Sequence, residues 1–334
     1  MFPLSRLECS RPYAADQGTC AFLFGGYRVE GILPLFKPAG LTSHDCVFRL
    51  RKILKTKKVG HTGTLDPDVT GVLPICIGKA TKVAEYITDA GKAYEGEVTI
   101  GYSTTTEDAS GETVAEKSVT RVIQREEILK VLQSLTGEIE QTPPMFSAVK
   151  VGGVRLYEYA RKGIEVERPT RKVTIYSIDL LDDRSEYIGE TIKFKFRVSC
   201  SKGTYIRTLA VMIGEMLGFP AHMSYLQRVQ SASYSLEDCL TFEEIEKHME
   251  AGTISSVLRP LETALSHLPK LQINDKVAEK VKNGALLQMP EHLKTSNGPI
   301  IAETVDGLAL AIYSKHPNKP DLFKPVKVLR NDLD

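Results

Sequence analysis

Hydrophobic positions repeat along this chain with two different spacings, and each spacing predicts a different kind of element. The segment GILPLFKPAG (31–40) is apolar and ends in a Pro/Gly turn, which is typical of a strand that leads into a turn. Hydrophobic residues then recur at helical spacing over 47–54, and Thr42 or Ser43 can cap the helix that this predicts. The segment KAYEGEVTIGY (92–102) instead alternates, which predicts a half-buried strand.

Helix and strand patterns continue to mix through the middle of the chain. REEILKVLQSLTG (125–137) is amphipathic, and GTYIRTLAVMIGEMLG (203–218) has an apolar stripe between a threonine cap and a terminal glycine, so both predict helices. KVTIYSIDLL (172–181) and TIKFKFRVSCS (191–201) predict two more strands. Because these elements lack the regular strand–helix–strand rhythm of a doubly wound sheet, we predict an α+β fold.

The pattern changes character near Pro260 and Pro269, which indicates a domain boundary. Short apolar segments separated by turn residues follow, as is typical of a small β-rich module. We therefore expect a main domain over 29–260 and a second domain over 261–334. The segment 1–28 has neither periodicity nor a signal-peptide pattern, so we interpret it as a disordered extension or a start site assigned too far upstream.

Composition sets limits without deciding the function. The chain has 334 residues, of which 42% are hydrophobic and 25% charged, as in an ordinary globular protein. No apolar run approaches the roughly 18 residues of a membrane span, so we expect no membrane partner. The six cysteines form neither a disulfide framework nor a zinc-binding spacing, which favours a reducing cytoplasm. A net charge of +1 gives no sign of nucleic acid, which must be inferred from local patches.

One segment combines ionisable residues with glycines in a way that fits neither a regular helix nor a regular strand. GHTGTLDPDVTGVLP (60–74) carries one histidine and two aspartates. Pro67 biases Asp66 toward an extended conformation, and the glycines allow unusual dihedral angles or the close approach of a ligand. An isolated Asp-Pro dipeptide is most often part of a tight turn in which the aspartate caps nearby amides. The surrounding histidine, threonines and glycines favour a functional loop.

Two known patterns partly match this loop. DPDVT (66–70) has the D-x-D-x-T spacing of haloacid-dehalogenase-like phosphatases, and the acidic pair at 182–183 could mimic their magnesium-binding carboxylates. That family places its nucleophile directly after a hydrophobic strand, whereas GHTGTL precedes Asp66, so a phosphatase is a remote alternative. A P-loop ending in Gly78-Lys79 is excluded, because Leu73 stands where its first glycine is required and Ala80 stands where Ser or Thr would bind magnesium.

A third interpretation gives Asp66 a chemical role without metal or cofactor. As a nucleophile or base, Asp66 needs a cationic partner to stay ionised when a substrate excludes water. Arg207 in SKGTYIRTL (201–209) is the candidate, because it opens a predicted helix whose first amides also suit an anion. Without this context, Arg207 would more often be a surface or structural ion-pair residue.

Four motifs carry a resemblance to a known family. They are GHTGTLDPDVTGVLPICIGKATK (60–82), KAY (92–94), TPPMFSAVKVGGVRLYEYARKG (142–163) and CSKGTYIRTLA (200–210). In this order they resemble the bacterial branch of the TruB family of tRNA pseudouridine synthases, over roughly residues 31–245. The resemblance implies a mixed, mostly antiparallel sheet with flanking helices, which forms the catalytic domain, and a reduced PUA-like RNA-binding domain at the C-terminus. It also implies conversion of uridine 55 in the T arm of tRNA to pseudouridine, by base flipping and without metal or cofactor.

The resemblance assigns roles to individual residues. Asp66 matches the catalytic aspartate, acting either at C6 of uracil or at C1′ of ribose, and Arg207 matches the arginine that pairs with it and lowers its pKa. Tyr94 matches the tyrosine that stacks on the target base. His61 matches a histidine that fills the space left by the flipped uridine. The remaining matches line the uracil pocket: Tyr205 and Leu226.

Basic residues around the loop are expected to contact the RNA backbone. They are Lys37, Arg49, Arg51, Lys52, Lys55, Lys57, Lys58, Lys79 and Lys82. Lys37 also belongs to an early Lys-Pro motif that could support the cleft wall. The chain departs from the family at Gln227, where an arginine is more common, and this could weaken a phosphate contact.

The resemblance further implies a monomer that binds tRNA. We expect this binding to be direct, without a guide RNA, since the long basic tails of guide-RNA-dependent relatives are missing. An alternative of a different class is a tRNA-binding and folding factor whose chemistry is secondary or lost. The presence of Asp66, Tyr94 and Arg207 favours the enzyme.

Overall fold

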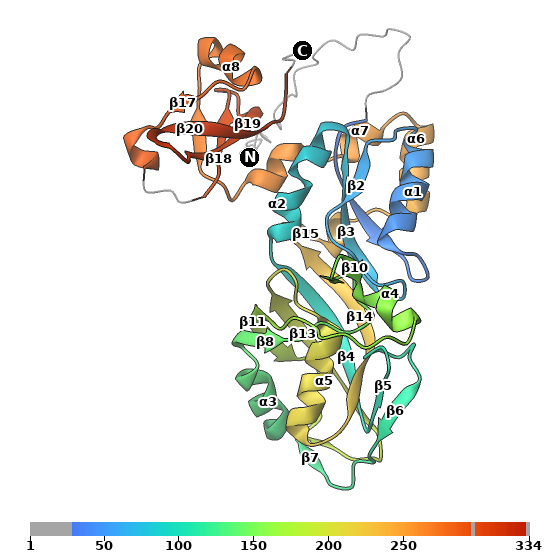
Figure 1. Ribbon diagram of the computed structural model, residues 1–334. Coiled ribbons are helices and arrows are strands. Elements are labelled where there is room, and N and C mark those ends of the chain that lie inside the picture. The colour runs from blue at the N-terminus through green and yellow to red at the C-terminus, as the bar shows by residue number, and fades with distance from the viewer. Residues whose placement is uncertain (1–28, 295–297, 332–334) are drawn as a thin grey trace, which may run out of the picture.

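A computed structural model describes residues 29–294 and 298–331 of the chain. It has a larger body built on a central sheet and a smaller β-rich module that lies beside α2 (Ala84–Asp89) (Figure 1). Strands and helices are mixed within the larger body, so the predicted α+β class is confirmed. The expectation for residues 1–28 lies outside the described residues.

The central sheet has the strand order β1-β3-β14-β4-β13-β11-β8, with β2 paired to β3 and β15 paired to β14. Only β3 and β14 run parallel among these pairs, so the predicted mixed, mostly antiparallel sheet is confirmed. Its strands are β1 (Gly31–Lys37), β2 (Val59–His61), β3 (Thr70–Ile77), β4 (Lys92–Ile100), β8 (Gly137–Gln141), β11 (Arg171–Leu180), β13 (Ile192–Cys200), β14 (Ala221–Ser231) and β15 (Tyr234–Ser235).

The remaining elements of the larger body flank this sheet. The helices are α1 (Ser43–Ile53), α3 (Arg125–Ser134), α4 (Leu156–Arg161), α5 (Ile206–Leu217), α6 (Phe242–Glu250) and α7 (Ile254–Val257), with 3-10 turns at Gly78–Val83, Leu236–Asp238 and Leu261–Leu265. Short strands form three two-stranded antiparallel sheets: β5 (Tyr102–Thr104) with β6 (Thr113–Glu116), β7 (Ile123–Gln124) with β12 (Glu186–Tyr187), and β9 (Lys150–Val151) with β10 (Val154–Arg155).

Two helix starts show where cap prediction succeeds and where it fails. Thr42 caps α1 through a capping box, because its hydroxyl accepts from the Asp45 amide at 3.0 Å while the Asp45 carboxylate accepts from the Thr42 amide at 2.9 Å. The predicted threonine cap of α5 is wrong: Tyr205 is the N-cap residue and makes no side-chain cap. The end of α5 is as predicted, with Gly218 in the left-handed region at φ 85°.

Alternation along β4 and β13 creates the main hydrophobic core. Val98, Phe194 and Phe196 point to one face of the sheet, where they pack with residues of α3 and α5. The helices therefore cover the same face to which Tyr94 belongs, two positions from Gly96 and four from Val98. This places the start of α5 next to β4.

A close approach between β3 and β14 requires a glycine. Gly71 has φ 109°, and a Cβ atom built on it would lie 2.2 Å from the carbonyl oxygen of Arg228, its partner in the parallel pair. Any side chain here would therefore push the two strands apart. The end of the predicted functional loop is thus fixed against β14.

The C-terminal module has its own five-stranded sheet, in the order β16-β18-β19-β20-β17, and its own hydrophobic core. A β-rich C-terminal domain is therefore confirmed, whereas the boundary at residue 260 stays a prediction. Its elements are β16 (Lys270–Gln272), α8 (Asp275–Lys282), β17 (Leu287–Gln288), a 3-10 turn (Glu291–Leu293), β18 (Ile300–Glu303), β19 (Ala309–His316) and β20 (Lys319–Val328). In the ranges that the structure describes, no helix is long and apolar enough to cross a membrane.

Candidate active site

The loop between β2 and β3 carries Asp66, and elements earlier in the chain hold it in place. Lys37 at the end of β1 donates from Nζ to the carbonyl oxygens of Pro67 at 2.8 Å and Val69 at 2.7 Å. The hydroxyl of Ser43, at the start of α1, accepts from the Leu65 amide at 2.8 Å. Backbone groups on both sides of Asp66 are therefore fixed by side chains from outside the loop.

Asp66 meets Arg207 as the sequence predicted. Arg207 Nη2 lies 3.1 Å from Asp66 Oδ2, and the arginine side chain is only 6% exposed whereas that of Asp66 is 41% exposed. The same guanidinium donates to the carbonyl oxygens of Thr106 and Phe146, each at 3.0 Å, and lies 3.5 Å from Asp108 Oδ2. A buried arginine whose two terminal nitrogens are both bonded thus presents one of them to a partly exposed carboxylate.

The pKa of Asp66 is raised above its ordinary value, and the largest cause is desolvation by the surrounding protein. Arg207 lowers this pKa, as expected, and Lys37 lowers it further. The negative charges of Asp108 and Asp68 raise it. Burial therefore outweighs the arginine, and the ion pair only partly offsets the cost of holding a carboxylate in this cleft.

Asp66 lies between two cavities. One, of about 390 Å³, is also lined by Phe146, Tyr157 and Arg161. The other, of about 300 Å³, is also lined by Tyr94 and Tyr205. Four residues line both cavities: Asp66, Val69, Arg207 and Leu226. The carboxylate and its arginine thus stand where the two cavities meet, so a ligand that occupies either one contacts them.

The predicted pocket residues come from three elements. Tyr94 on β4 is 8% exposed, and burial raises the pKa of its hydroxyl while the neighbouring Arg228 lowers it. Leu226 on β14 lies beside Gly96, where a Cβ atom would come within 3.3 Å of the leucine side chain. Tyr205 precedes α5; its amide donates to Gln141 Oε1 at 3.0 Å, and Arg171 stacks 4.7 Å from its ring centroid.

Comparison with known proteins identifies the family. Residues 51–206 match the N-terminal domain of the TruB family pseudouridylate synthases, and residues 207–266 match the C-terminal domain of tRNA pseudouridylate synthase B. The chain belongs to the TruB family. It is 60% identical over 302 residues to the tRNA pseudouridine synthase B of Geobacillus thermodenitrificans, covering 90% of this chain and 100% of that protein. It is 59% identical over 306 residues to that of Bacillus cereus, covering 92% and 99%.

Solved structures confirm the pseudouridine synthase fold. The chain is similar to one in a Cbf5-Nop10-Gar1 complex, with a TM-score of 0.67, 28% identity and coverage of 90% of this chain and 85% of that chain. It is also similar to one in an H/ACA RNP bound to a substrate RNA containing 2'-deoxyuridine, with a TM-score of 0.67, 26% identity and coverage of 90% and 86%. As a TruB family member, this protein is an isomerase.

The proposed backbone contact of Lys37 is wrong for this TruB family member. Lys37 is fully buried, and its ammonium group bonds three carbonyl oxygens, including that of Pro38 at 2.9 Å. Burial lowers its pKa. It therefore supports the loop from behind and is unavailable to a phosphate, which agrees with the cleft-wall role of its Lys-Pro motif.

Some of the other basic residues bond to groups of the protein itself, and others are exposed to solvent. Arg49 pairs with Glu246 at 3.2 Å and stacks on Phe242, and Arg51 donates to the Val59 carbonyl oxygen at 3.1 Å. Lys82 donates to two carbonyl oxygens at the end of the C-terminal module, those of Val328 and Leu329. These three serve contacts within the protein, whereas four lysines are exposed: Lys52, Lys55, Lys57 and Lys58. Lys79 is half-buried, and a backbone contact there stays a prediction.

His61 stands apart from both cavities. It ends β2, is half-buried, and accepts a bond at Nδ1 from the Gly63 amide at 3.4 Å. Burial, together with Arg228 and His44, lowers its pKa, so its imidazole is neutral at physiological pH. His61 lines neither cavity, and its predicted role in the space left by the flipped uridine stays a prediction.

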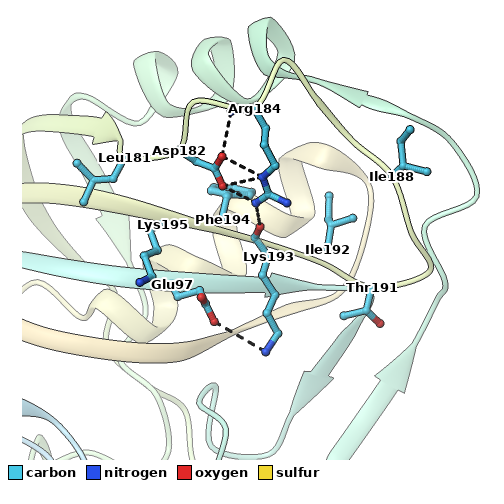
Figure 2. Close-up of a pocket in the computed structure, with 10 residues that line it drawn as sticks. All are labelled: Glu97, Leu181, Asp182, Arg184, Ile188, Thr191, Ile192, Lys193, Phe194 and Lys195. Carbon is cyan, nitrogen blue, oxygen red and sulfur yellow. Dashed lines mark hydrogen bonds and ion pairs between the residues drawn. The ribbon is translucent and has the colours of Figure 1, made fainter.

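Asp182, the first carboxylate of the acidic pair invoked for a phosphatase, lines a different pocket. Asp182 is ion-paired with Arg184, whose guanidinium also donates to the Lys193 carbonyl oxygen, and Lys193 in turn lies 3.8 Å from Glu97 (Figure 2). None of the residues that line this pocket lines either cavity at Asp66. Family membership and this placement together show that the phosphatase alternative is wrong.

Two residues of the site had no signal in the sequence. Asp108 lies in TTTEDASG, which reads as an ordinary polar loop, yet it reaches Arg207. Arg228 is 1% exposed, donates from Nε to the Val72 carbonyl oxygen at 2.7 Å, and lines the cavity of Tyr94. The departure at Gln227 also has a local explanation, because its amide donates to the Thr70 hydroxyl at 3.2 Å.

Proposed function

We propose that this protein converts uridine 55 in the T arm of tRNA to pseudouridine, with Asp66 as the catalytic carboxylate and Arg207 as its partner. The observation that carries the proposal is the 3.1 Å pair between Asp66 and Arg207 at the junction of two cavities. Its relatives at about 60% identity are tRNA pseudouridine synthases B, which supports tRNA as the substrate.

The reaction breaks the N1–C1′ bond of uridine, rotates the uracil and rejoins it through C5. Asp66 either adds to C6 of the ring or acts at C1′ and then helps to remove the C2′ proton. Both routes need the ionised carboxylate. Arg207 supports that form, because it lowers the pKa of Asp66 against the opposing effect of burial.

The cavity lined by Tyr94, Tyr205 and Leu226 suits a planar base. Tyr94 offers a ring for stacking, Leu226 offers an apolar contact, and the cavity of about 300 Å³ adjoins Asp66. A uridine inside a folded T arm must leave its stack to enter this cavity, which costs a few kcal/mol. We assign to His61 the space that the base leaves, where a neutral imidazole can stack in its place.

The tRNA is bound directly by a monomer, without a guide RNA and without metal or cofactor. The exposed lysines of α1 and the following turn, Lys52, Lys55, Lys57 and Lys58, contact phosphates near the loop. We place the protein in a reducing cytoplasm, which agrees with free thiols at Cys46, Cys76, Cys200 and Cys239.

Tritium release tests this function. A tRNA transcript labelled with tritium at uridine C5 loses that hydrogen when pseudouridine forms, so released label counts turnovers. We expect one equivalent per tRNA in the presence of EDTA, mapped to position 55, and none with Asp66→Asn. Release mapped to another uridine would refute the position. Tight tRNA binding without release from the wild-type protein would instead support the folding-factor alternative.

A further inference from the structure

The loop between β5 and β6 joins the first turn of α5 through two adjacent pairs of residues. Asp108 Oδ2 lies 3.5 Å from Arg207 Nη1. One residue earlier in the loop and one residue later in the helix, the Thr208 hydroxyl donates to Glu107 Oε2 at 2.7 Å. We call this second contact the Glu107–Thr208 clasp. It lies one residue away from the arginine that holds Asp66.

The backbone of the same loop also supports Arg207. The guanidinium donates from Nη1 to the Thr106 carbonyl oxygen at 3.0 Å, directly before Glu107. The Met223 amide of β14 donates to the Glu107 carbonyl oxygen at 3.0 Å. The direction of the Thr106 carbonyl therefore depends on the conformation of the loop at residue 107.

That conformation is an unfavourable one for glutamate. Glu107 has φ 63°, in the left-handed region that residues with a Cβ atom seldom adopt. Such a backbone persists where surrounding contacts fix it, and this is common at functional sites. The contacts here are the bond from the Glu107 amide to the Thr104 carbonyl oxygen at 3.2 Å, the bond from Met223 to the Glu107 carbonyl oxygen, and the clasp to its side chain.

The side chain of Glu107 is partly buried, and its carboxylate has few partners. Among the residues that the structure describes, the Thr208 hydroxyl is its one hydrogen-bond donor. Burial raises the pKa of Glu107, while Thr208, Arg207 and Arg168 lower it and Glu215 raises it. A partly buried carboxylate is costly without a donor, so loss of the Thr208 hydroxyl should displace Glu107 from this position.

We propose that Glu107 and Thr208 are positioning residues for the isomerisation. Their clasp fixes the Thr106 carbonyl and Asp108 against Arg207, and Arg207 in turn holds Asp66 at the reacting nucleotide. Neither Glu107 nor Thr208 is among the residues that line the two cavities, so they act through Arg207 rather than on the RNA. The inference rests on the proposed roles of Asp66 and Arg207.

Removal of the clasp should slow the chemical step and spare binding. Thr208→Val keeps the shape of the side chain and removes the donor, so we expect kcat to fall about tenfold to hundredfold with KM changed less than about threefold. Thr208→Ser restores a hydroxyl and should bring kcat back to within about threefold of the wild type. Glu107→Gln keeps an acceptor without the charge and should lie between these variants.

Two further variants separate positioning from general destabilisation. The double variant Thr208→Val with Glu107→Gln should be no slower than Thr208→Val alone, because both changes break one contact. Thr241 offers a matched control: its hydroxyl donates to the Glu244 carboxylate at 2.9 Å at the start of α6, outside both cavities. Thr241→Val should lower the thermal midpoint and leave kcat unchanged.

The experiment combines tritium release with NMR of the Arg207 guanidinium in arginine-labelled full-length protein, assigned with Arg207→Lys. We expect Thr208→Val and Glu107→Gln to lower kcat and to change the Arg207 side-chain signals and their line widths. Unchanged Arg207 signals, or an unchanged kcat with only a lower thermal midpoint, would overturn the inference. Absence of turnover in the wild type would refute the proposed function, and the Arg207 signals would then decide the clasp by themselves.

Discussion

The ammonium group of Lys37 donates a hydrogen bond of 2.8 Å to the carbonyl oxygen of Pro67, the residue directly after Asp66 in the chain. The loop that carries Asp66 is therefore shaped by a cation that lies behind it, on β1, rather than by the loop alone. The same group bonds Val69 at 2.7 Å on the far side of the turn. One buried lysine thus sets the direction of the backbone on which the Asp66 carboxylate is carried.

Replacement of this lysine should loosen the loop. Lys37→Met keeps the length of the side chain but leaves three carbonyl oxygens without their donor, so we expect a loss of about 2 kcal/mol in the free energy of unfolding. The rate of pseudouridine formation should fall by more than the loss of folded protein accounts for, because Asp66 moves with the loop. Urea unfolding and tritium release measure the two effects. Lys130→Met, which removes an exposed cation on α3 outside both cavities, is the control and should change neither by much.

Asp66→Asn should abolish isomerisation and leave tRNA binding within about tenfold, because only the ionisable group is lost. It should also stabilise the protein at pH 7. The pKa of Asp66 is raised in the folded state, so the native state binds more protons than the unfolded one between the two pKa values, and stability falls as pH rises through that window. Removal of the carboxylate removes this cost. A lower thermal midpoint for the variant at pH 7 would contradict the argument.

Arg207→Ala should move the acid limb of the pH–rate profile to higher pH. Arg207 lowers the pKa of Asp66, so its loss raises that pKa further and the ionised carboxylate appears only at higher pH. Arg207→Lys keeps a positive charge and should move the limb less. Profiles of kcat/KM from about pH 5 to 9 give the comparison. An unmoved limb in Arg207→Ala would mean that the pair is structural.

The sequence identified the residue types of this site better than its electrostatics. Asp66 stands in a loop whose composition is unusual for a turn, and Arg207 could be singled out as its cationic partner at the start of a predicted helix, whereas Tyr94 was assigned only through the family resemblance. The balance at Asp66 could not, because desolvation depends on how several segments close around the carboxylate. Lys37 shows the same limit: a lysine beside a functional loop suggests phosphate contact until its burial is known.

Residues that act through others were the hardest to foresee. Asp108 and Arg228 reach the site from a polar loop and from β14, and both contacts arise from sheet order rather than from local pattern. The fold class was predictable because alternation and helical spacing report directly on burial. The parallel pairing of β3 with β14 was not, since nothing in either strand specifies its neighbour.

His61→Ala should slow the reaction more on a folded T arm than on an unstructured RNA with the same uridine. The proposed role of His61 is to occupy the place of the extruded base, and an unstructured RNA has no stack to refill. Single-turnover rates on the two substrates give the ratio. Equal slowing on both would show that His61 instead serves the loop, through its contact with the Gly63 amide.

Gly71→Ala should be among the most damaging single-methyl changes in the protein. The added Cβ would lie 2.2 Å from the Arg228 carbonyl oxygen, and the strands cannot separate without moving both the end of the Asp66 loop and the cavity wall at Arg228. Gly40→Ala is a matched control: its φ of 82° is also left-handed, but a Cβ there meets nothing within 4 Å. It should cost only the backbone strain, about 1 kcal/mol. Urea unfolding of both variants measures the difference, and equal losses would mean that β3 and β14 can part freely.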